Sequence, residues 1–415
     1  MIRLLFSLFF IWTQFGWSQQ TSFYAGAAYM NITPAFPVPL SGYADRAQPS
    51  QGVHDSIYAR AFVFEQGATQ ACIIQADLIG FSFEFVEELT GQIEIKTGIP
   101  AKNCLLVAAH NHGGPSTRAY GETATDHLTA YLDQLKKSLV DAVQMAWTKR
   151  EPARIGYGEG LCRMNINRRA RHAEGGIWLG RNPDGPCDHR VDVIRLENLA
   201  GKPLGLLINW PCHATVGGQE NSLVTGDWPG ATVRYLEKNG YIGIPIGVFA
   251  GASGDINPIY GPHNNFREMN AVGLVLSEEV LRAVKDIPMV QPLKLEVRQV
   301  MKDIPGKQKS ATRLPGEKIV PGEPVPLRWS VLQLGPLVIC GISGELMTEI
   351  GMDIKRVSPF RHTVLMTHCN GNSGYLCTDA AYAEGGYEPM VSRTRPGTAQ
   401  LIKEQMLQLL NGLFK

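Results

Sequence analysis

Long apolar runs are missing from this chain once its first residues are set aside. A helix that spans a membrane needs about 20 consecutive apolar residues, and no segment after residue 18 reaches that length. Long runs of one charge are missing too, since 39 basic residues are spread among 38 acidic ones. Nucleic acid is therefore not expected as a partner. A transmembrane segment is not expected either, which leaves transient contact with a membrane surface open.

Cysteine is scarce, with eight among 415 residues, and no two are spaced as C-x-x-C. So low a content excludes a small protein held together by a disulfide framework. Cys104, Cys212 and Cys340 lie within apolar runs, where a buried free thiol is as consistent as a disulfide, and the pairing stays open. Internal repeats and low-complexity linkers are also missing. We therefore expect one domain over residues 19–415.

The N-terminus has the pattern of a secretory signal peptide. Met1–Arg3 is a short basic start, Leu4–Trp12 is an apolar stretch, and Gly16-Trp17-Ser18 offers small residues at a cleavage site. The apolar stretch is too short to span a membrane. We predict a cleaved signal peptide over residues 1–18 and a mature protein that is secreted or periplasmic.

Short apolar runs recur along the chain, as expected of strands that are covered on both faces. They cover residues 71–76, 105–109, 191–196, 206–210, 246–250, 293–300, 337–342 and 363–367. Segments between and after them predict helices over residues 84–96, 126–147, 229–238, 270–285 and 398–414. This mixture predicts an α/β fold in which a layered, mixed β-sheet is flanked by helices. Residues 302–326, rich in Lys, Pro and Gly, are expected to form an insertion or an exposed loop.

Polar residues follow several of the predicted strands. His110-Asn111-His112 comes directly after Leu105–Ala109 and is closed by glycines, which let a ligand approach the backbone. In a strand, residues i and i+2 point the same way, so both imidazoles can face one point. Comparable places are taken by Asp77, His213, Asp255, Glu345 and Asn370. The carboxyl ends of strands are where sites assemble in α/β sheets, so this pattern predicts an active site there. Two satisfied histidines at a strand end are the alternative.

A series of motifs also runs in order along the chain. They are Gly42-Tyr43, Gly52-Val53-His54, Ala59-Arg60-Ala61-Phe62, His110-Asn111-His112-Gly113-Gly114-Pro115, Asn167-Arg168, Gly254-Asp255-Ile256-Asn257-Pro258, Gly344-Glu345 and Asn370-Gly371-Asn372-Ser373-Gly374-Tyr375. In this order they resemble the G-Y, G-I-H, A-R-A-F, H-T-H-S-G-P, N-R-S, G-D-V-S-P, P-G-E and N-G-Y-x-x-Y motifs of the neutral/alkaline non-lysosomal ceramidase family, in its N-terminal catalytic domain. Members of that family are zinc amidohydrolases that cleave the N-acyl bond of ceramide, giving sphingosine and a fatty acid. The resemblance implies the same class of reaction here.

The resemblance implies a zinc ion (Zn²⁺) held by His110, His213, Glu345 and Tyr375. Two imidazoles, a carboxylate and a phenolate oxygen are ligands that suit zinc, and a catalytic zinc site keeps a position for water. Zinc lowers the pKa of water and polarises a carbonyl, so no protein nucleophile is needed. The alternative for Tyr375 is a packed aromatic ring whose hydroxyl is satisfied elsewhere.

Two further roles follow from the same resemblance. His112 is implied to orient water or to transfer a proton to the leaving amine. Arg168 is implied to anchor the developing oxyanion or the polar head of the substrate. The alternative for Arg168 is a solvated basic face that it shares with Arg169 and Arg171.

The chain departs from the family pattern at several positions. Asp255 and Asn257 are carried over as catalytic candidates, but Asn257 stands where the family has serine. Asn cannot act as a nucleophile, so a serine-dependent mechanism is excluded at that position, although the amide can donate to a carbonyl. Gly113 and Asn372 replace a serine and a tyrosine of the family motifs. The chain ends at Lys415, and we expect the family's C-terminal immunoglobulin-like domain to be absent.

We therefore predict a zinc-dependent hydrolase that cleaves an N-acyl amide bond of ceramide or a related sphingolipid with metal-activated water. A second hypothesis keeps the zinc hydrolase and changes the substrate to another amide or ester, on a glycan or a small acylated amine. A third is a non-catalytic homologue that binds lipid or sugar, against which the presence of all four implied ligands argues. Trp210, Trp228 and Tyr260 are expected near the substrate, in a cleft open to polar headgroups.

Overall fold

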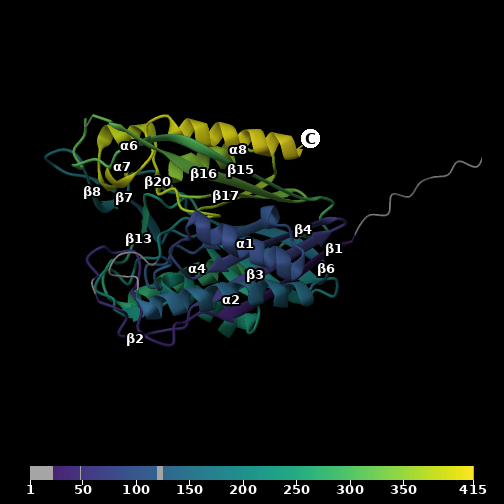
Figure 1. Ribbon diagram of the computed structural model, residues 1–415. Coiled ribbons are helices and arrows are strands. Elements are labelled where there is room, and N and C mark those ends of the chain that lie inside the picture. The colour runs from purple at the N-terminus through teal and green to yellow at the C-terminus, as the bar shows by residue number, and fades with distance from the viewer. Residues whose placement is uncertain (1–21, 47, 119–124, 317, 415) are drawn as a thin grey trace, which may run out of the picture.

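The computed structural model describes residues 22–46, 48–118, 125–316 and 318–414 of the chain (Figure 1). The signal peptide predicted over residues 1–18 lies outside these ranges. Within them, no helix is both long enough and apolar enough to cross a membrane.

The larger of two main sheets has nine strands and mixes parallel with antiparallel pairs. Its strands follow the order β12 (Ile246–Ala250), β10 (Pro203–Trp210), β9 (Arg190–Asn198), β6 (Glu151–Leu161), β1 (Phe23–Asn31), β3 (Tyr58–Gln66), β4 (Thr69–Ala76) and β5 (Cys104–Ala108), and β14 (Met289–Val290) pairs with β6. The parallel pairs are β4 with β5 and β10 with β12. An isolated parallel bridge between Asn111 and Ala214 joins the segments that follow β5 and β10. The carboxyl ends of β5 and β10 therefore lie together.

The second main sheet is formed by the C-terminal third of the chain. Its strands follow the order β15 (Leu295–Lys307), β16 (Pro321–Leu334), β17 (Leu337–Ile342) and β19 (His362–Met366), and only β17 and β19 are parallel. An isolated bridge between Val107 and Cys369 ties the segment after β19 to β5. The ends of strands from both sheets are thus brought to one place.

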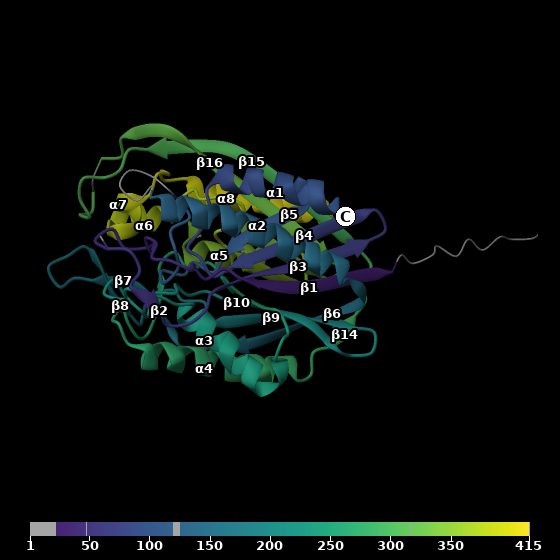
Figure 2. The same ribbon diagram turned by 60° about the horizontal axis from the view of Figure 1, so that its bottom comes forward.

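Side chains alternate between a central core and three outer cores, because successive residues of a strand point to opposite faces. Ile73 of β4, Leu207 of β10 and Ile339 of β17 lie in the central core between the sheets. Their neighbours Ile74, Ile208 and Cys340 face helices instead. These helices are α1 (Phe83–Thr97) and α2 (Asp126–Thr148) over β3 to β5, α3 (Asp227–Leu236) and α4 (Phe266–Val284) over β9 to β12, and α5 (Thr348–Val357) and α8 (Thr398–Phe414) over the second sheet. Figures 1 and 2 show this arrangement, with α8 along the outside of the second sheet.

Shorter elements gather beyond the strand ends. A three-stranded sheet is formed by β13 (Ile256–Pro258), β7 (Asn165–Arg171) and β8 (Ile177–Asn182). Two-stranded pairs are formed by β18 (Glu345–Leu346) with β20 (Tyr375–Leu376), and by β11 (Leu223–Val224) with β2 (Gly52–Val53). The helices α6 (Asp379–Glu384) and α7 (Tyr387–Val391) follow β20. These elements carry four of the eight predicted site residues, namely Arg168, Asn257, Glu345 and Tyr375.

The predicted fold class is confirmed: mixed sheets are layered and flanked by helices. The expectation of a loop over residues 302–326 is wrong at both ends. Residues 302–307 and 321–326 extend β15 and β16 as a paired hairpin, in which Ile304 faces Val325 and both are buried. The buried pair of Ile304 and Val325 and the backbone pairing around it outweigh the Lys, Pro and Gly content of this segment. All eight cysteines are free thiols, and seven of them are buried.

Candidate metal centre at the strand ends

The site is built from segments that leave strands at their carboxyl ends. His110 follows β5, His213 follows β10, and Glu345 follows β17. His112 donates its backbone N–H to the carbonyl of Ala214 over 3.1 Å, and His213 donates its own to the carbonyl of Ile256 over 3.1 Å. The first bond holds the two histidine segments against each other, and the second ties His213 to β13.

The turn that carries His110 and His112 is fixed by the residue between them. β5 ends at Ala108, and His110 has a φ of 55°. The Asn111 side chain donates to the carbonyls of Asp77 and Thr225 over 3.0 and 2.7 Å, and it accepts from the Gly113 N–H. Strand alternation therefore does not aim the rings. The directions of the two rings are set instead by the left-handed backbone conformation of His110, which is unfavourable for a non-glycine residue, and by the anchored side chain of Asn111.

Gly113 serves packing rather than ligand access. A Cβ there would lie 2.6 Å from Thr225 Cγ2 and 2.8 Å from its carbonyl oxygen. We expected this glycine to let a ligand approach the backbone, but it lets the chain pack against Thr225 instead. Gly42 has a φ of 100°, and a Cβ there would lie 2.2 Å from His112 Nδ1. The segment Gly42-Tyr43 thus closes one side of His112.

Three imidazoles converge. One nitrogen from each of His110, His112 and His213 lies within 4.8 Å of the others. Glu345 joins them, since its Oε2 lies 3.4 Å from His110 Nε2 and 3.3 Å from His213 Nε2. At these distances the carboxylate oxygen is buried without a hydrogen bond among the described residues. An oxygen and nitrogens left facing one point are the arrangement that a cation satisfies.

The hydrogen bonds of the Nδ1 atoms of His110 and His213 decide which ring nitrogens face the shared point of the cluster. His110 Nδ1 lies 3.0 Å from the carbonyl oxygen of Ile79. His213 Nδ1 lies 2.8 Å from the carbonyl of Ser253 and 3.1 Å from that of Ile256. A carbonyl accepts only, so each Nδ1 carries the proton and each Nε2 carries the lone pair. This is the support that metal-binding histidines have in proteins.

Glu345 and Tyr375 are brought together by strand pairing. They face each other in register on the parallel strands β18 and β20, thirty residues apart in the chain. The Tyr375 hydroxyl accepts from Arg168 Nη2 over 3.0 Å. Burial raises the pKa of Tyr375 well above its ordinary value despite the nearby Arg168, so the group is a neutral phenol unless a metal ion binds it.

Burial also governs the other ionisable groups of the site. It lowers the pKa of His213 to about 4 and holds the pKa of His112 well below its usual range. Burial alone would raise the pKa of Glu345, but His110 and His213 outweigh it and hold that pKa well below its usual value. A metal site requires deprotonated ligands, and the lowered pKa values of His213 and Glu345 favour that state.

Arg168 is buried, with a relative exposure of 5%, so the solvated-face interpretation is wrong for it. Its Nε donates to Glu388 Oε1 over 2.7 Å, and its Nη1 lies 3.2 Å from His213 Nε2. Arg169 is buried as well and pairs with the same Glu388 over 2.8 Å. Only Arg171 of this cluster is a surface side chain, with 82% of it exposed.

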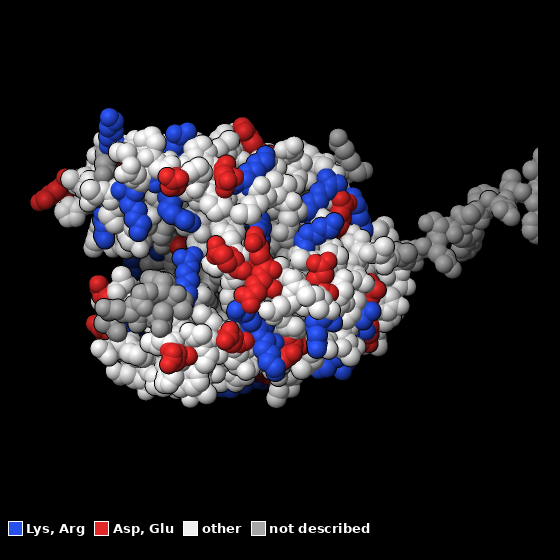
Figure 3. Space-filling view, in the orientation of Figure 1, with Lys and Arg blue, Asp and Glu red and all other residues white. Residues whose placement is uncertain are grey.

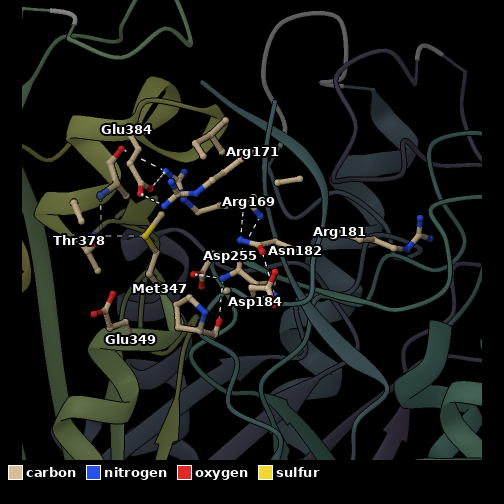
Figure 4. Close-up of a pocket in the computed structure, with 17 residues that line it drawn as sticks. Arg169, Arg171, Arg181, Asn182, Asp184, Asp255, Met347, Glu349, Thr378 and Glu384 are labelled. Atoms are coloured by element: carbon tan, nitrogen blue, oxygen red, sulfur yellow. Dashed lines mark hydrogen bonds and ion pairs between the residues drawn. The ribbon is translucent and has the colours of Figure 1, made fainter. Parts of the chain in front are cut away.

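The two candidates of the Gly254–Pro258 segment lie differently. Asn257 borders the site, where its Oδ1 accepts from Arg168 Nη1 over 3.3 Å. Asp255 is buried, accepting from the Thr348 N–H over 2.8 Å and from Asn167 Nδ2 over 3.1 Å. It lies in the wall of a separate pocket of about 590 Å³ (Figure 4). Its side chain therefore braces this segment, and a catalytic role for it stays a prediction.

Two of the three aromatic residues expected near the substrate are not accessible to it. Trp210 and Trp228 are fully buried in the core under α3 and α4. Trp228 Nε1 donates to the backbone carbonyl of His213 over 2.9 Å, so it supports the histidine from behind. Tyr260 is 38% exposed. Nearness in the sequence to His213 did not predict access to the site, because both tryptophans are buried in the core between the sheet and the helices α3 and α4.

His368 was missed by sequence reasoning. Its ring stacks on that of His110, with centroids 3.8 Å apart and planes at 13°. It is 3% exposed, and its Nε2 has no hydrogen-bond partner within the part of the chain that the structure describes. The signal was present, since His368 follows the predicted strand over residues 363–367 as His110 follows β5.

The residues present fit a zinc ion. Two supported Nε2 atoms and an ionised carboxylate oxygen face one point, and a phenol in register lies beside the carboxylate. Nitrogen and oxygen donors of this kind suit zinc. The space-filling view shows the molecule hollowed on its left side, where β7, β13 and β20 lie in Figure 1 (Figure 3).

Comparisons with known proteins agree on one family. Residues 23–244 match the model of the family described as neutral/alkaline non-lysosomal ceramidase, N-terminal. Neutral ceramidase A of Dictyostelium discoideum is 29% identical over 264 residues, which cover 58% of this chain and 36% of the relative. Neutral ceramidase of Pseudomonas aeruginosa is 26% identical over 261 residues, which cover 58% of this chain and 38% of the relative. The matched part spans little more than a third of these relatives.

The fold also matches solved structures. The crystal structure of neutral ceramidase from Pseudomonas aeruginosa superposes with a TM-score of 0.79 at 19% identity, over 95% of this chain and 74% of that one. A structure described as ceramidase complexed with C2 gives a TM-score of 0.81 at 19% identity, over 95% and 75% of the two chains. These matches extend the likeness in fold beyond residue 244.

Proposed function

Because the chain belongs to the neutral/alkaline non-lysosomal ceramidase family, we propose that it is a zinc-dependent hydrolase that cleaves the N-acyl amide bond of ceramide or a related sphingolipid. The observation that carries the proposal is the convergence of His110, His213 and Glu345 at the ends of strands from both sheets. A binding protein without turnover would have no need of two supported imidazoles and a buried carboxylate at one point.

In this proposal His110, His213, Glu345 and Tyr375 hold the zinc. When bound, zinc supplies a Lewis acid for the scissile carbonyl and lowers the pKa of water. We assign proton transfer to His112, and the support is that its Nε2 lies 3.3 Å from His110 Nε2 at the edge of the same cluster. A neutral imidazole accepts a proton from water and passes it to the leaving amine.

We assign to Arg168 the binding of negative charge beside the cluster. Glu388 and Tyr375 fix its guanidinium from two sides. Asn257 contacts the same guanidinium, which leaves its amide nitrogen for a substrate carbonyl. A cation and an amide donor held in place before the reaction stabilise an oxyanion without reorganisation.

The test is a panel of acyl amides incubated with purified protein, before and after treatment with a chelator. We expect release of fatty acid that the chelator abolishes and added zinc restores. Hydrolysis that continues unchanged in the chelator would contradict zinc dependence. A panel without any turnover by the zinc-loaded protein would favour the binding protein instead.

A second candidate keeps the reaction and changes the substrate to a short or glycan-linked acyl group. The observation in its favour is the polar lining of a pocket of about 660 Å³, which includes Arg118, Arg393 and Asn372 beside Phe83 and Leu132. Turnover of a fluorescent long-chain ceramide and of a short N-acetylated amino sugar separates the two. Activity on the amino sugar alone would retire the sphingolipid and leave the zinc hydrolase intact.

Export is part of the proposal and rests on residues 1–18. Expression of the chain with its N-terminus intact should yield a processed protein outside the cytoplasm. Mass spectrometry of the mature N-terminus should place the cleavage after Ser18. An unprocessed cytoplasmic product would contradict it.

A further inference from the structure

Three large apolar side chains are exposed at one end of the molecule. Trp178 and Leu179 of β8 are 53% and 40% exposed, and Leu314, in the segment between β15 and β16, is 66% exposed. We call the described parts of residues 171–181 and 309–318 the hairpin rim. An exposed tryptophan beside exposed leucines is costly in water and favourable at a lipid interface.

The two segments of the rim lie side by side, although more than a hundred residues separate them in the chain. A Cβ on Gly176 would lie 4.0 Å from Pro315 Cδ. The Gly386 N–H donates to the carbonyl of Arg313 over 2.8 Å, and a Cβ on Gly386 would lie 3.0 Å from Ile177. Figures 1 and 2 show both segments at the same end of the molecule.

The rim is continuous with the metal centre. The guanidinium of Arg313 lies over the ring of Tyr387, 5.5 Å from its centroid. The Tyr387 ring in turn lies 5.8 Å from that of Tyr375. β7, which pairs with β8 of the rim, carries Arg168. A surface in contact with the rim would therefore lie next to the residues that we place at the reaction.

Basic side chains flank the apolar ones. Arg171, Lys309, Arg313 and Lys318 are all exposed, and Glu174 is the exposed acid of the hairpin turn. Figure 3 shows mostly blue groups on this end of the molecule, with red at its tip. Apolar side chains inside a margin of Lys and Arg fit an interface between acyl chains and anionic headgroups.

We propose that the hairpin rim docks the protein on an anionic lipid bilayer, with Trp178 and Leu314 inserted at the headgroup level. The proposal rests on the proposed function, since a hydrolase of sphingolipids meets its substrate in a bilayer. It goes beyond that function because it names the surface and the residues that bind the membrane.

The experiment measures co-flotation of the full chain with vesicles of phosphatidylcholine, with and without phosphatidylglycerol. The test variant is Trp178→Ser combined with Leu314→Ser. The control is Ile95→Ser on α1, an 89% exposed apolar residue flanked by Glu94 and Lys96 and far from the rim in the chain. All three proteins are also assayed on a water-soluble short-chain amide, and a His213→Ala protein is floated beside them.

We expect the double variant to lose about tenfold or more in binding to anionic vesicles, and Ile95→Ser to bind as the parent does. Turnover of the soluble amide should stay equal in these proteins. Binding of the parent should weaken with added salt, because the basic margin is screened. His213→Ala should float as the parent does, so a failure of the proposed chemistry leaves this test intact.

Equal binding of the double variant and the parent would overturn the proposal. A parent that does not float with any vesicle would overturn it too. Self-association through the rim would overturn it as well. In that case the parent would be a dimer, the double variant would be a monomer, and both would bind vesicles equally.

Discussion

At the scale of single residues, most of the site depends on side chains whose direction is set by a hydrogen bond to the backbone. His110 and His213 each place one ring nitrogen on a carbonyl, and Asn111 anchors the turn between the two histidines of its motif. Support of this kind fixes the tautomer as well as the angle of the ring. A substitution that removes such a hydrogen bond or ring contact should therefore change the activity or the metal affinity of the site.

Arg168→Lys should lower kcat by about 100-fold while the metal is retained, because Lys keeps the charge and loses the planar fork that an oxyanion needs. Arg171→Lys is the matched control, since that side chain is exposed in the same strand. Steady-state kinetics on a soluble amide, with metal content measured by mass spectrometry, checks both. Equal kcat in the two variants would remove Arg168 from the reaction.

His368→Ala should weaken zinc binding about tenfold or more, as loss of a residue that supports a ligand does. His368→Phe should restore most of the affinity, because a ring there still stacks on His110. Competition against a zinc-binding dye measures both. If Phe and Ala weaken binding equally, the unpartnered Nε2 matters rather than the stack. Unchanged affinity in both variants would leave His368 without a part in the site.

At the scale of elements, the loop that carries His213 is tied to the start of α3. Asp227 accepts from the backbone N–H groups of Gly217 over 2.9 Å and Trp228 over 2.7 Å. It does so with a φ of 49°, a conformation that Asp and Asn tolerate better than most residues. One carboxylate thus joins the first turn of a helix to the loop beyond β10.

Burial raises the pKa of Asp227 from 3.8 to about 6. The folded protein therefore holds a proton between these pH values that the unfolded chain releases. The resulting stabilisation is full below about pH 3.8 and is lost as the pH rises through about 6, at most about 3 kcal/mol. In Asp227→Asn this dependence should vanish, so the variant loses less stability than the parent between pH 4 and about 7. Urea unfolding at both pH values measures the difference, and parallel pH profiles would contradict it.

At the scale of the whole molecule, the site joins the two main sheets. His110 and His213 follow strands of the nine-stranded sheet, and Glu345 follows a strand of the second one. A ligand that binds all three only in the folded state stabilises the entire fold by mass action. The metal should therefore act as a link between sheets as well as a cofactor.

Removal of the metal should lower the melting temperature of the parent, with a loss of about 4 kcal/mol when free zinc had been about 1,000 times its Kd. His213→Ala should melt at one temperature with or without chelator, because it has lost a ligand. Calorimetry in zinc and in chelator gives both values. An equal shift in the two proteins would mean that the metal binds elsewhere.

Much of this architecture could be predicted from the sequence because it depends on short-range patterns. Every predicted apolar strand is present, and so is each predicted helix. The polar residues after those strands were found in the same way, since strand ends are local. By contrast, β1 and β3 were not predicted, because Phe23–Asn31 and Tyr58–Gln66 mix small or polar residues with apolar ones.

The sequence by itself determined that strands and helices form layers, that polar residues follow the strands, and that its motifs resemble those of a family. Each of these can be seen in short stretches of neighbouring residues. Only the tertiary structure decided which of those ends meet. Glu345 reaches Tyr375 through the pairing of two short strands, His368 reaches His110 through the bridge between β5 and the segment after β19, and Trp228 is withdrawn behind His213. The physical reason is that strand alternation is set within a few residues. The meeting of strand ends depends on pairing between segments far apart in the chain, which no local pattern encodes.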